Sequence, residues 1–281
     1  MIPLDVGRLR DILRIALDED LGSGDVTSLA TIPPMARAMA RYTTKQPLVV
    51  SGLPVIEEVA RMVDPKLSFE SLSADGASVK EAVAIAELSG SARSILAAER
   101  VTLNLLQRMC GIATETSLYV QKVAGTKATI IDTRKTVPGL RLLDKYAVAC
   151  GGGTNHRMGL YDAILIKNNH LAFHSTLSET VKMARENIAG TMKIEVEASN
   201  LMQLEDAIRA GADVVLLDNF SAELTRQAVA QCRGRVPLES SGGITIDNVR
   251  EYAEAGVDRI SVGALTHSVQ AADIHLRVTP I

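Results

Sequence analysis

The chain has 281 residues, of which 47% are hydrophobic and 22% charged, an ordinary composition for a globular protein. Its formal net charge of −3 argues against a general nucleic-acid binder, and the absence of an apolar run of about twenty residues argues against a membrane span. Because no apolar segment follows a basic start at the N-terminus, no signal peptide is expected, and we expect a cytoplasmic protein with three reduced, buried cysteines.

The first part of the chain predicts an α+β module. Residues 9–17 have an amphipathic helical pattern, and residues 36–52 predict strands interrupted by Pro47. Residues 67–90 predict strands on either side of the Asp75-Gly76 turn, and residues 92–109 predict a long helix. The boundary of this module is expected within residues 110–125.

From Ala128 onward, short β-rich runs alternate with amphipathic segments. The runs cover residues 128–133, 163–167, 193–198, 213–218, 236–241 and 259–264. Two intervening segments, residues 200–212 and 245–257, end in Ala-Gly, a helix stop, and have Asn200 and Asp247 near their starts, where capping residues lie. The alternation predicts a parallel sheet with helical crossovers. Six units, where a full barrel has eight, indicate a six-stranded barrel or an open sheet.

Polar residues lie at or just beyond the C-terminal end of strand after strand. They are Asp132, Arg134, Lys135, Lys167, Glu195, Glu197, Asp218, Glu239, Ser240 and Ser241. Buried parallel strands are nearly all apolar, so charges gathered at one end favour a barrel whose strand ends converge on a site. Solvated strand ends are the simpler alternative, but they explain only one or two of these cases.

Two segments predict anion binding. Arg134 and Lys135 leave a strand together, which suits an anion, although an Arg-Lys pair alone is usually solvated. In the second segment, three glycines precede His156 and Arg157, and Lys167 ends the next strand. His156 alone would more often be a structural hydrogen-bonder, but this combination is uncommon by chance.

Glu197 and Asp218 form an acidic side of the site. Carboxylates among basic groups suggest Mg²⁺, which favours one or two carboxylates together with substrate phosphates and waters. Alternatively, they pair with Arg134, Lys135 or Lys167 and hold the site in shape.

The last two strands run into glycine-containing turns. Residues 240–244 (SSGGI) and 261–265 (SVGAL) place backbone N–H groups where a phosphate could bind. Either turn alone could serve only loop formation.

These motifs together resemble the quinolinate phosphoribosyltransferase family. The segments DTRKTVPGLR, GGGTNHRMGLYDAILIKNNH, EVE, LLDN, ESSGGI and VGALTHS occur in the family's order, and residues 18–28 and 99–114 match as well. The resemblance spans almost the whole chain. It departs at Cys110, where serine is usual, and at Asn168, where aspartate is common.

The resemblance implies an α/β fold: an N-terminal α+β open sandwich domain (residues 1–112) and a six-stranded incomplete (β/α) barrel (residues 113–267) that carries the active site. A C-terminal tail, residues 268–281, is expected to return to the first domain. The resemblance also implies a homodimer with shared active sites, leaving open whether dimers form hexamers.

The implied reaction joins quinolinate to phosphoribosyl pyrophosphate and releases pyrophosphate and carbon dioxide, in de novo NAD biosynthesis. By resemblance, Arg134, Lys135, His156 and Arg157 surround quinolinate, and Arg100 reaches it from the partner subunit. Lys135, Lys167, Glu197 and Asp218 are the expected catalytic residues, with Glu197 and Asp218 serving Mg²⁺ directly or through water and substrate. The 5′-phosphate is expected at Ser241, Gly242, Gly243, Gly263 and Ala264.

Three alternatives remain. Lys167 could form a Schiff base, as in aldolases, although the surrounding arginines and acidic pair fit this less well. A homologue with another substrate, such as the molybdenum-transport-associated relatives, would lack the full NHR and KNNH pattern found here. A silent phosphate-binding protein would not need so many charged strand ends.

Overall fold

The computed structural model describes residues 4–173, 176–188, 190 and 192–281. Contacts divide the chain into two compact units. The first comprises the chain up to Ser117, residues 136–152 and residues 265–281, and the second comprises residues 118–135 and 153–264. Throughout the described ranges, no helix has both the length and the apolarity needed to cross a membrane.

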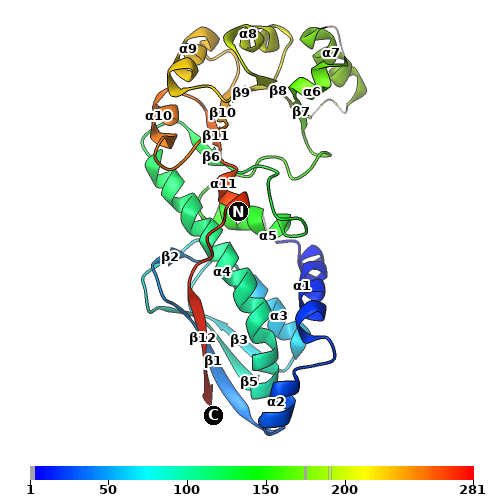
Figure 1. Cartoon of the computed structure of the whole chain (residues 1–281), viewed down its shortest axis with the longest axis vertical. Coiled ribbons are helices and arrows are strands. Elements are labelled where there is room, and N and C mark those ends of the chain that lie inside the picture. The colour runs from blue at the N-terminus through cyan, green and yellow to red at the C-terminus, as the bar shows by residue number, and fades with distance from the viewer. Residues whose placement is uncertain (1–3, 174–175, 189, 191) are drawn as a thin grey trace. The chain divides into compact units, whose positions relative to one another are not determined.

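The first unit is built on an antiparallel sheet of order β12-β1-β5-β3, with the C-terminal strand paired to β1 (Figure 1). A second, short ladder pairs β2 with β4. Its elements are α1 (Val6–Leu21), α2 (Val26–Thr31), β1 (Arg37–Thr44), β2 (Leu48–Val49), α3 (Leu53–Val63), β3 (Ser68–Ser71), β4 (Ser78–Val79), β5 (Ala84–Ser91), most of α4 (Ala92–Lys122), α5 (Arg141–Cys150) and β12 (Ile274–Pro280).

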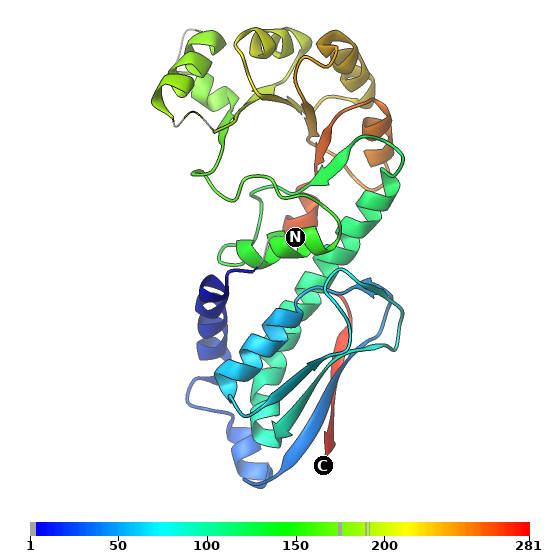
Figure 2. The same ribbon diagram turned by 180° about the vertical axis from the view of Figure 1, so that it is seen from behind.

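Alternation along β1 explains the core of this unit. Ala38, Ala40 and Tyr42 are buried from one face of the strand, as a period of two requires. Apolar residues of α3 and α4, among them Ile56 and Leu106, join them in one cluster, and Figure 2 shows both helices running along the sheet. The helix predicted for residues 92–109 is real but extends to Lys122.

The strands on either side of the Asp75-Gly76 turn form, but they do not pair with each other as a hairpin would. β3 pairs with β5, whereas β4 pairs with β2. The Asp75 carboxylate accepts hydrogen bonds from the backbone N–H groups of Gly52 and Leu53, at 3.0 and 3.1 Å. The turn is therefore attached to the start of α3, which separates the two flanking strands.

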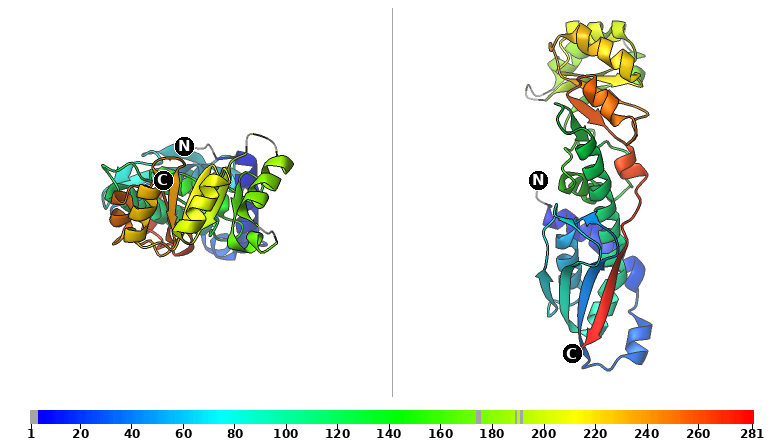
Figure 3. Two further views of the ribbon diagram at one scale, coloured as in Figure 1. Left: turned by 90° about the horizontal axis from the view of Figure 1, so that it is seen from above. Right: turned by 90° about the vertical axis from the view of Figure 1, so that its left-hand side faces the viewer.

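The second unit is a parallel sheet of six strands in the order β6-β11-β10-β9-β8-β7. Each predicted β-rich run contains one of them, and α7 to α10 lie on the outer side of the curved sheet (Figures 1 and 3). The elements are β6 (Thr129–Ile131), β7 (Ile164–Ile166), α6 (Asn168–Leu171), α7 (Leu177–Asn187), β8 (Ile194–Ala198), α8 (Leu201–Arg209), β9 (Val214–Asp218), α9 (Ala222–Cys232), β10 (Leu238–Ser241), α10 (Val249–Glu254) and β11 (Arg259–Ser261), after which α11 (Ala264–His267) begins.

Helix caps in this unit follow the sequence in part. The Asn200 side chain accepts a hydrogen bond from the Gln203 N–H at 2.9 Å and caps α8, as predicted. At α10 the cap residue is Asn248 rather than Asp247, and its side-chain oxygen accepts instead from the Thr245 N–H at 2.8 Å. A turn at Thr245 therefore begins before the helix and shifts its start by one residue.

The barrel is incomplete because β6 and β7 are the two edges of the sheet. Next to β6, Thr154 forms an isolated parallel bridge with Ile131, and its N–H donates to the Ile130 carbonyl at 2.8 Å. The segment that carries His156 and Arg157 therefore lies along the edge of β6. This placement brings the NHR motif to the open side of the barrel.

The strand register determines which side chains face the barrel interior. Glu239 on β10 aligns with Leu216 on β9 and Arg259 on β11, and Glu197 on β8 aligns with Leu216. Since side chains two residues apart share a face, Glu195 lies on the same inner face as Glu197. The inner face thus carries charged groups at more than one depth, unlike the apolar interior of most parallel sheets.

Candidate active site

The C-terminal ends of β7, β8 and β9 gather opposite charges. Lys167 follows β7, and its Nζ lies 3.2 Å from Oε2 of Glu197, which is 9% exposed. The Asn168 amide contacts Oε1 of Glu197 at 3.4 Å, while Asp218 accepts from the Asn219 amide at 3.0 Å. Asp218 stands two residues beyond the partner of Glu197 in the ladder, so both carboxylates share the inner face. The lysine and the two carboxylates predicted from the sequence therefore lie at neighbouring strand ends.

The turn after β10 is fitted closely to the end of β9. The Asn219 N–H donates to the Ser241 carbonyl at 2.9 Å, which extends the ladder beyond Asp218. Gly242 has φ +94°, and a Cβ there would overlap the Asn219 amide. Gly243 has φ +62°, but its missing Cβ would meet no atom within 4 Å. The turn is closed on its Asn219 side and open at Gly243, where a ligand could approach the backbone.

Asp132 joins the two basic motifs. It is fully buried at the end of β6 and accepts hydrogen bonds from the His156 N–H at 2.8 Å and the Asn155 amide at 2.7 Å. Its own N–H donates to the Thr154 carbonyl at 3.2 Å. The first residue of the DTRK motif therefore fixes the position of the NHR motif.

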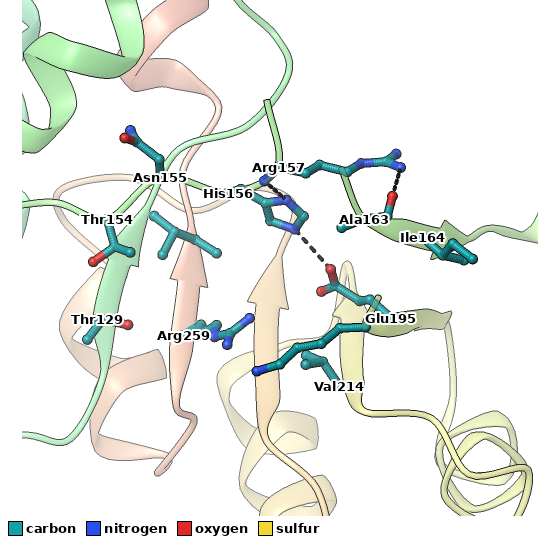
Figure 4. Close-up of a pocket in the computed structure, with 12 residues that line it drawn as sticks. Thr129, Thr154, Asn155, His156, Arg157, Ala163, Ile164, Glu195, Val214 and Arg259 are labelled. Carbon is teal, nitrogen blue, oxygen red and sulfur yellow. Dashed lines mark hydrogen bonds and ion pairs between the residues drawn. The ribbon is translucent and has the colours of Figure 1, made fainter. Parts of the chain in front are cut away.

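Both ring nitrogens of His156 are engaged. Nδ1 accepts the backbone N–H of Arg157 at 2.7 Å, so the ring proton belongs on Nε2. Nε2 lies 2.9 Å from Oε2 of Glu195 (Figure 4) and 3.8 Å from Oε2 of Glu239. The imidazole thereby connects the barrel interior to the backbone of Arg157.

Arg157 and Arg134 form the cationic part of the site. Arg157 is half-buried, and its Nη1 donates to the Ala163 carbonyl at 3.0 Å. Burial, followed by the positive charge of Arg134, lowers the pKa of Arg157. The two guanidinium groups are thus close enough to repel each other, and an anion between them would relieve that repulsion.

The other predicted residues differ in exposure and in the element that carries them. Arg134 and Lys135 are exposed, and the Lys135 N–H donates to the Thr133 hydroxyl at 3.0 Å. Gly263 and Ala264 follow β11, beside the Val262 N–H that donates to the Ile131 carbonyl at 3.0 Å. Arg100 is exposed on α4, within the first compact unit.

A cavity of about 190 Å³ lies inside the barrel. His156 and Arg157 line it, together with Glu195, Arg259 and residues from the starts of several strands (Figure 4). The charged groups at the strand ends, such as Lys167, Glu197 and Asp218, are not among its lining residues. His156 therefore stands where the interior cavity adjoins the motif that carries the site's cations.

The sequence places Asp132, Glu195 and Glu239 among the polar strand ends that converge on the site but indicates no individual role for them, and it does not single out Asn155. A signal for Glu195 was present, because its alternation with Glu197 places both on one face. The contact of Glu195 with His156 joins segments 39 positions apart, so only the folded chain reveals it.

Comparisons with known proteins indicate one family over nearly the whole chain. The family descriptions "Quinolinate phosphoribosyl transferase, N-terminal domain" and "C-terminal domain" match residues 25–110 and 112–277. The chain belongs to the quinolinate phosphoribosyltransferase family. The family and the fold class expected from the sequence are thereby confirmed.

Individual relatives cover nearly the full length of the chain. A Mycobacterium leprae protein named nicotinate-nucleotide pyrophosphorylase [carboxylating] is 42% identical over 95% of this chain and 96% of its own. The structure of a nicotinate-nucleotide pyrophosphorylase from Francisella tularensis is 40% identical, with a TM-score of 0.92 over 99% of this chain and 98% of that one. A structure of the same name from Ehrlichia chaffeensis is 38% identical, with a TM-score of 0.91 over 96% and 98%. The family likeness therefore extends through both compact units.

Proposed function

We propose that this chain transfers the phosphoribosyl group of phosphoribosyl pyrophosphate to quinolinate. The products are nicotinate mononucleotide, pyrophosphate and carbon dioxide, as a step in NAD biosynthesis. The observation that carries the proposal is the gathering of cations and carboxylates at the strand ends of a barrel from this family. The curated names of relatives, which include quinolinate phosphoribosyltransferase [decarboxylating], support the same reaction.

Quinolinate is a dianion, and the chain as a whole has a net charge of −3. Its recognition therefore requires a local excess of positive charge. Arg134, Lys135 and Arg157 supply that excess. Burial and the charge of Arg134 lower the pKa of Arg157, and a bound carboxylate would oppose both effects. Guanidinium groups bind carboxylates through paired hydrogen bonds, so the two arginines suit the two carboxylates of the pyridine.

Lys167, Glu197 and Asp218 are proposed to serve the phosphoribosyl donor. As the bond between C1 of the ribose and pyrophosphate breaks, positive charge develops on the sugar. The Glu197 carboxylate would stabilise that charge, while Lys167, 3.2 Å away, would face the departing pyrophosphate. The ion pair between them holds both side chains in place before the substrate binds.

The donor set at the end of β8 and β9 also fits Mg²⁺. Two carboxylates on one face offer hard oxygen ligands, and this ion takes its other ligands from substrate phosphates and water. Glu197 and Asp218 would hold it. When bound, the ion neutralises charge on the leaving pyrophosphate.

The 5′-phosphate of the ribose is proposed to lie against the turns after β10 and β11. Ser241, Gly242 and Gly243 form one turn, and Gly263 and Ala264 form the other. The open space at Gly243 supports close approach of a phosphate to the backbone N–H groups. A side chain at 242 would displace Asn219 and disturb the end of β9 beside Asp218.

The order of chemical events follows from electron flow. The pyridine nitrogen donates its electron pair to C1 of the ribose, and the C1–oxygen bond breaks with its electrons going to pyrophosphate. The nitrogen becomes positively charged, so the adjacent ring carbon can accept the electron pair released when its carboxylate leaves as carbon dioxide. That carbon then takes a proton from solvent. Transfer therefore precedes decarboxylation, and the protein mainly positions charged groups.

We further propose a homodimer in which Arg100 of one subunit serves the quinolinate site of the other. The exposure of Arg100 on α4 supports this role. Arg100→Ala and Lys135→Ala should each be nearly inactive alone. Mixed dimers would contain one complete site, so an equal mixture should regain about a quarter of the wild-type activity. Regain of no activity, in mixtures shown to exchange subunits, would refute the shared site.

The reaction is tested by pyrophosphate release from the purified protein with quinolinate, phosphoribosyl pyrophosphate and Mg²⁺, with nicotinate as the control acid. Release with quinolinate but not with nicotinate is the expected result. Release with nicotinate alone would keep the reaction class and change the substrate, whereas release with neither would refute the proposal.

A further inference from the structure

Two glutamates inside the barrel have no part in the reaction described above. Glu195 on β8 and Glu239 on β10 are 6% and 0% exposed. One oxygen of each lies with Nε2 of His156 in a group whose members are all within 4.8 Å of one another. Burying two carboxylates side by side is costly unless a proton or a partner compensates them, so this cluster needs an explanation.

The cluster is connected directly to the proposed quinolinate site. Glu195 contacts His156 Nε2 at 2.9 Å, and His156 Nδ1 accepts the Arg157 N–H at 2.7 Å. Both ring nitrogens are therefore occupied by the protein, and Arg157 receives its backbone orientation from a ring that Glu195 holds. The chain of contacts runs from the barrel interior to one of the two proposed substrate arginines.

Glu239 completes the cluster from the neighbouring part of the sheet. Neither of its oxygens makes a hydrogen bond of ordinary geometry with the described residues, although the side chains of Ser261 and Glu195 lie close enough to act on it, and Oε1 of Glu195 also lacks such a bond. The charged groups that face Glu239 are Glu195, His156 and Arg259 on the adjacent strand. Burial and the Glu195 carboxylate raise the pKa of Glu239 well above its usual range. A protonated Glu239 fits this setting, since its O–H can donate to the open oxygen of Glu195.

We propose that Glu195 and Glu239 are positioning residues for the quinolinate site. Glu195 holds His156 in the Nε2–H tautomer, and a neutral, hydrogen-bonding Glu239 holds Glu195, so that Arg157 is presented to a substrate carboxylate. The inference rests on the proposed function, because it assigns the two glutamates to the recognition of quinolinate rather than of phosphoribosyl pyrophosphate.

The kinetic test compares Glu195→Ala, Glu239→Ala and Glu239→Gln with Glu223→Gln, an exposed control on α9. Losing a hydrogen bond to a charged group should raise the KM for quinolinate about 10-fold to 100-fold in both alanine variants. The KM for phosphoribosyl pyrophosphate should stay within about twofold. Glu239→Gln keeps a neutral donor and should remain close to the wild type.

A spectroscopic readout does not depend on turnover. The ¹⁵N chemical shifts of the His156 ring should report the Nε2–H tautomer in the wild type and in Glu239→Gln, and a change of tautomer or a tautomer mixture in Glu195→Ala. If the wild type has this tautomer but does not turn over quinolinate, the proposed function fails while the positioning of His156 stands. Thermal unfolding of each variant separates lost positioning from lost folding.

Three results would overturn the inference. Parallel rises in both KM values would mean a general structural role. Equal damage from Glu239→Gln and Glu239→Ala would exclude a neutral hydrogen-bonding group at 239. The same donor atoms would also suit a divalent cation, so one equivalent of metal in the purified wild type that is absent from Glu239→Gln would show a metal site instead.

Discussion

Glu195 and Glu197 lie two residues apart on β8, and their side chains face the same side of the sheet. Their surroundings nevertheless differ. Glu197 lies at the strand end, where Lys167 and Asn168 contact its two oxygens. Glu195 lies deeper, where His156 engages one oxygen and the other has no partner among the described residues. The period of two that places both residues on one face thus creates two different chemical positions.

The comparison suggests how a small barrel separates residues that bind substrate from residues that hold other side chains in position. At the strand ends Lys167 is exposed and Asp218 is partly exposed, so the group that contains the buried Glu197 can exchange protein partners for ligand atoms. Groups one step deeper are enclosed, and their contacts act only through other residues. Substitutions at the strand end and in the interior should therefore have different effects.

The largest effect is expected for Arg157→Ala and Arg134→Ala. Truncating an arginine that pairs with a desolvated carboxylate costs about 2–5 kcal/mol. Quinolinate binding should therefore weaken by about 30-fold or more, while the thermal unfolding temperature changes little. Titration calorimetry with quinolinate measures this, with Arg226→Ala on α9 as an exposed control. Near-normal affinity in both variants would show that quinolinate does not bind at this part of the barrel.

Glu197→Gln should reduce turnover on the order of 100-fold, the effect typical of losing one group that stabilises transition-state charge. Glutamine keeps the size of the side chain and its contact with Asn168, but it cannot balance the charge of Lys167 or of the sugar. Steady-state kinetics should show a fall in kcat for Glu197→Gln and a rise in the quinolinate KM for Glu195→Ala. The same pattern from both variants would contradict the division between strand end and interior.

The sequence predicts the strands and the face on which each glutamate lies, because these depend on local pattern. The six β-rich runs and their polar ends are predictable because the alternation of strands with helices, and the glycines that end the helices, are local features of the sequence. The KIEVEA run even placed Glu195 and Glu197 on one face. The surroundings of the two glutamates are not predictable in this way, because the partner of Glu195 is His156 and the partner of Glu197 is Lys167, and both partners come from other segments.

The same limit applies to the pairing of strands in the first unit. A turn at Asp75-Gly76 was readable, but its flanking strands pair with β2 and β5 because Asp75 binds the backbone at Gly52 and Leu53. Those contacts span more than twenty positions. Local turn chemistry predicts where the chain bends, and long-range hydrogen bonds decide which strands become neighbours.

A moderate effect on stability is expected at the turn after β10. Gly242→Ala must place a Cβ at φ +94° and displace the Asn219 side chain, whereas Gly243→Ala has φ +62° and free space. The backbone cost alone is about 1–2 kcal/mol for each, so the overlap should make Gly242→Ala the less stable variant. Urea unfolding of the pair isolates the contact with Asn219. Equal stabilities would mean that Asn219 moves away freely and that the strand end is not tightly fitted.

The smallest effect is expected for a third carboxylate, Glu205, which lies outside the barrel on α8. Arg235 donates to both of its oxygens, at 3.0 and 2.7 Å, and this pairing lowers the pKa of Glu205 from its ordinary 4.5 to about 2. A carboxyl group whose pKa is lower in the folded state adds stability that is complete above the unfolded value and is lost as the pH falls toward the folded value. The difference in unfolding temperature between the wild type and Glu205→Gln should therefore be small at about pH 7 and smaller still at about pH 4, because solvent screens an exposed pair. If this difference in unfolding temperature grew as the pH fell, the pair of Glu205 and Arg235 would not favour the folded state. Glu205 and the enclosed Glu195 would then differ in burial alone.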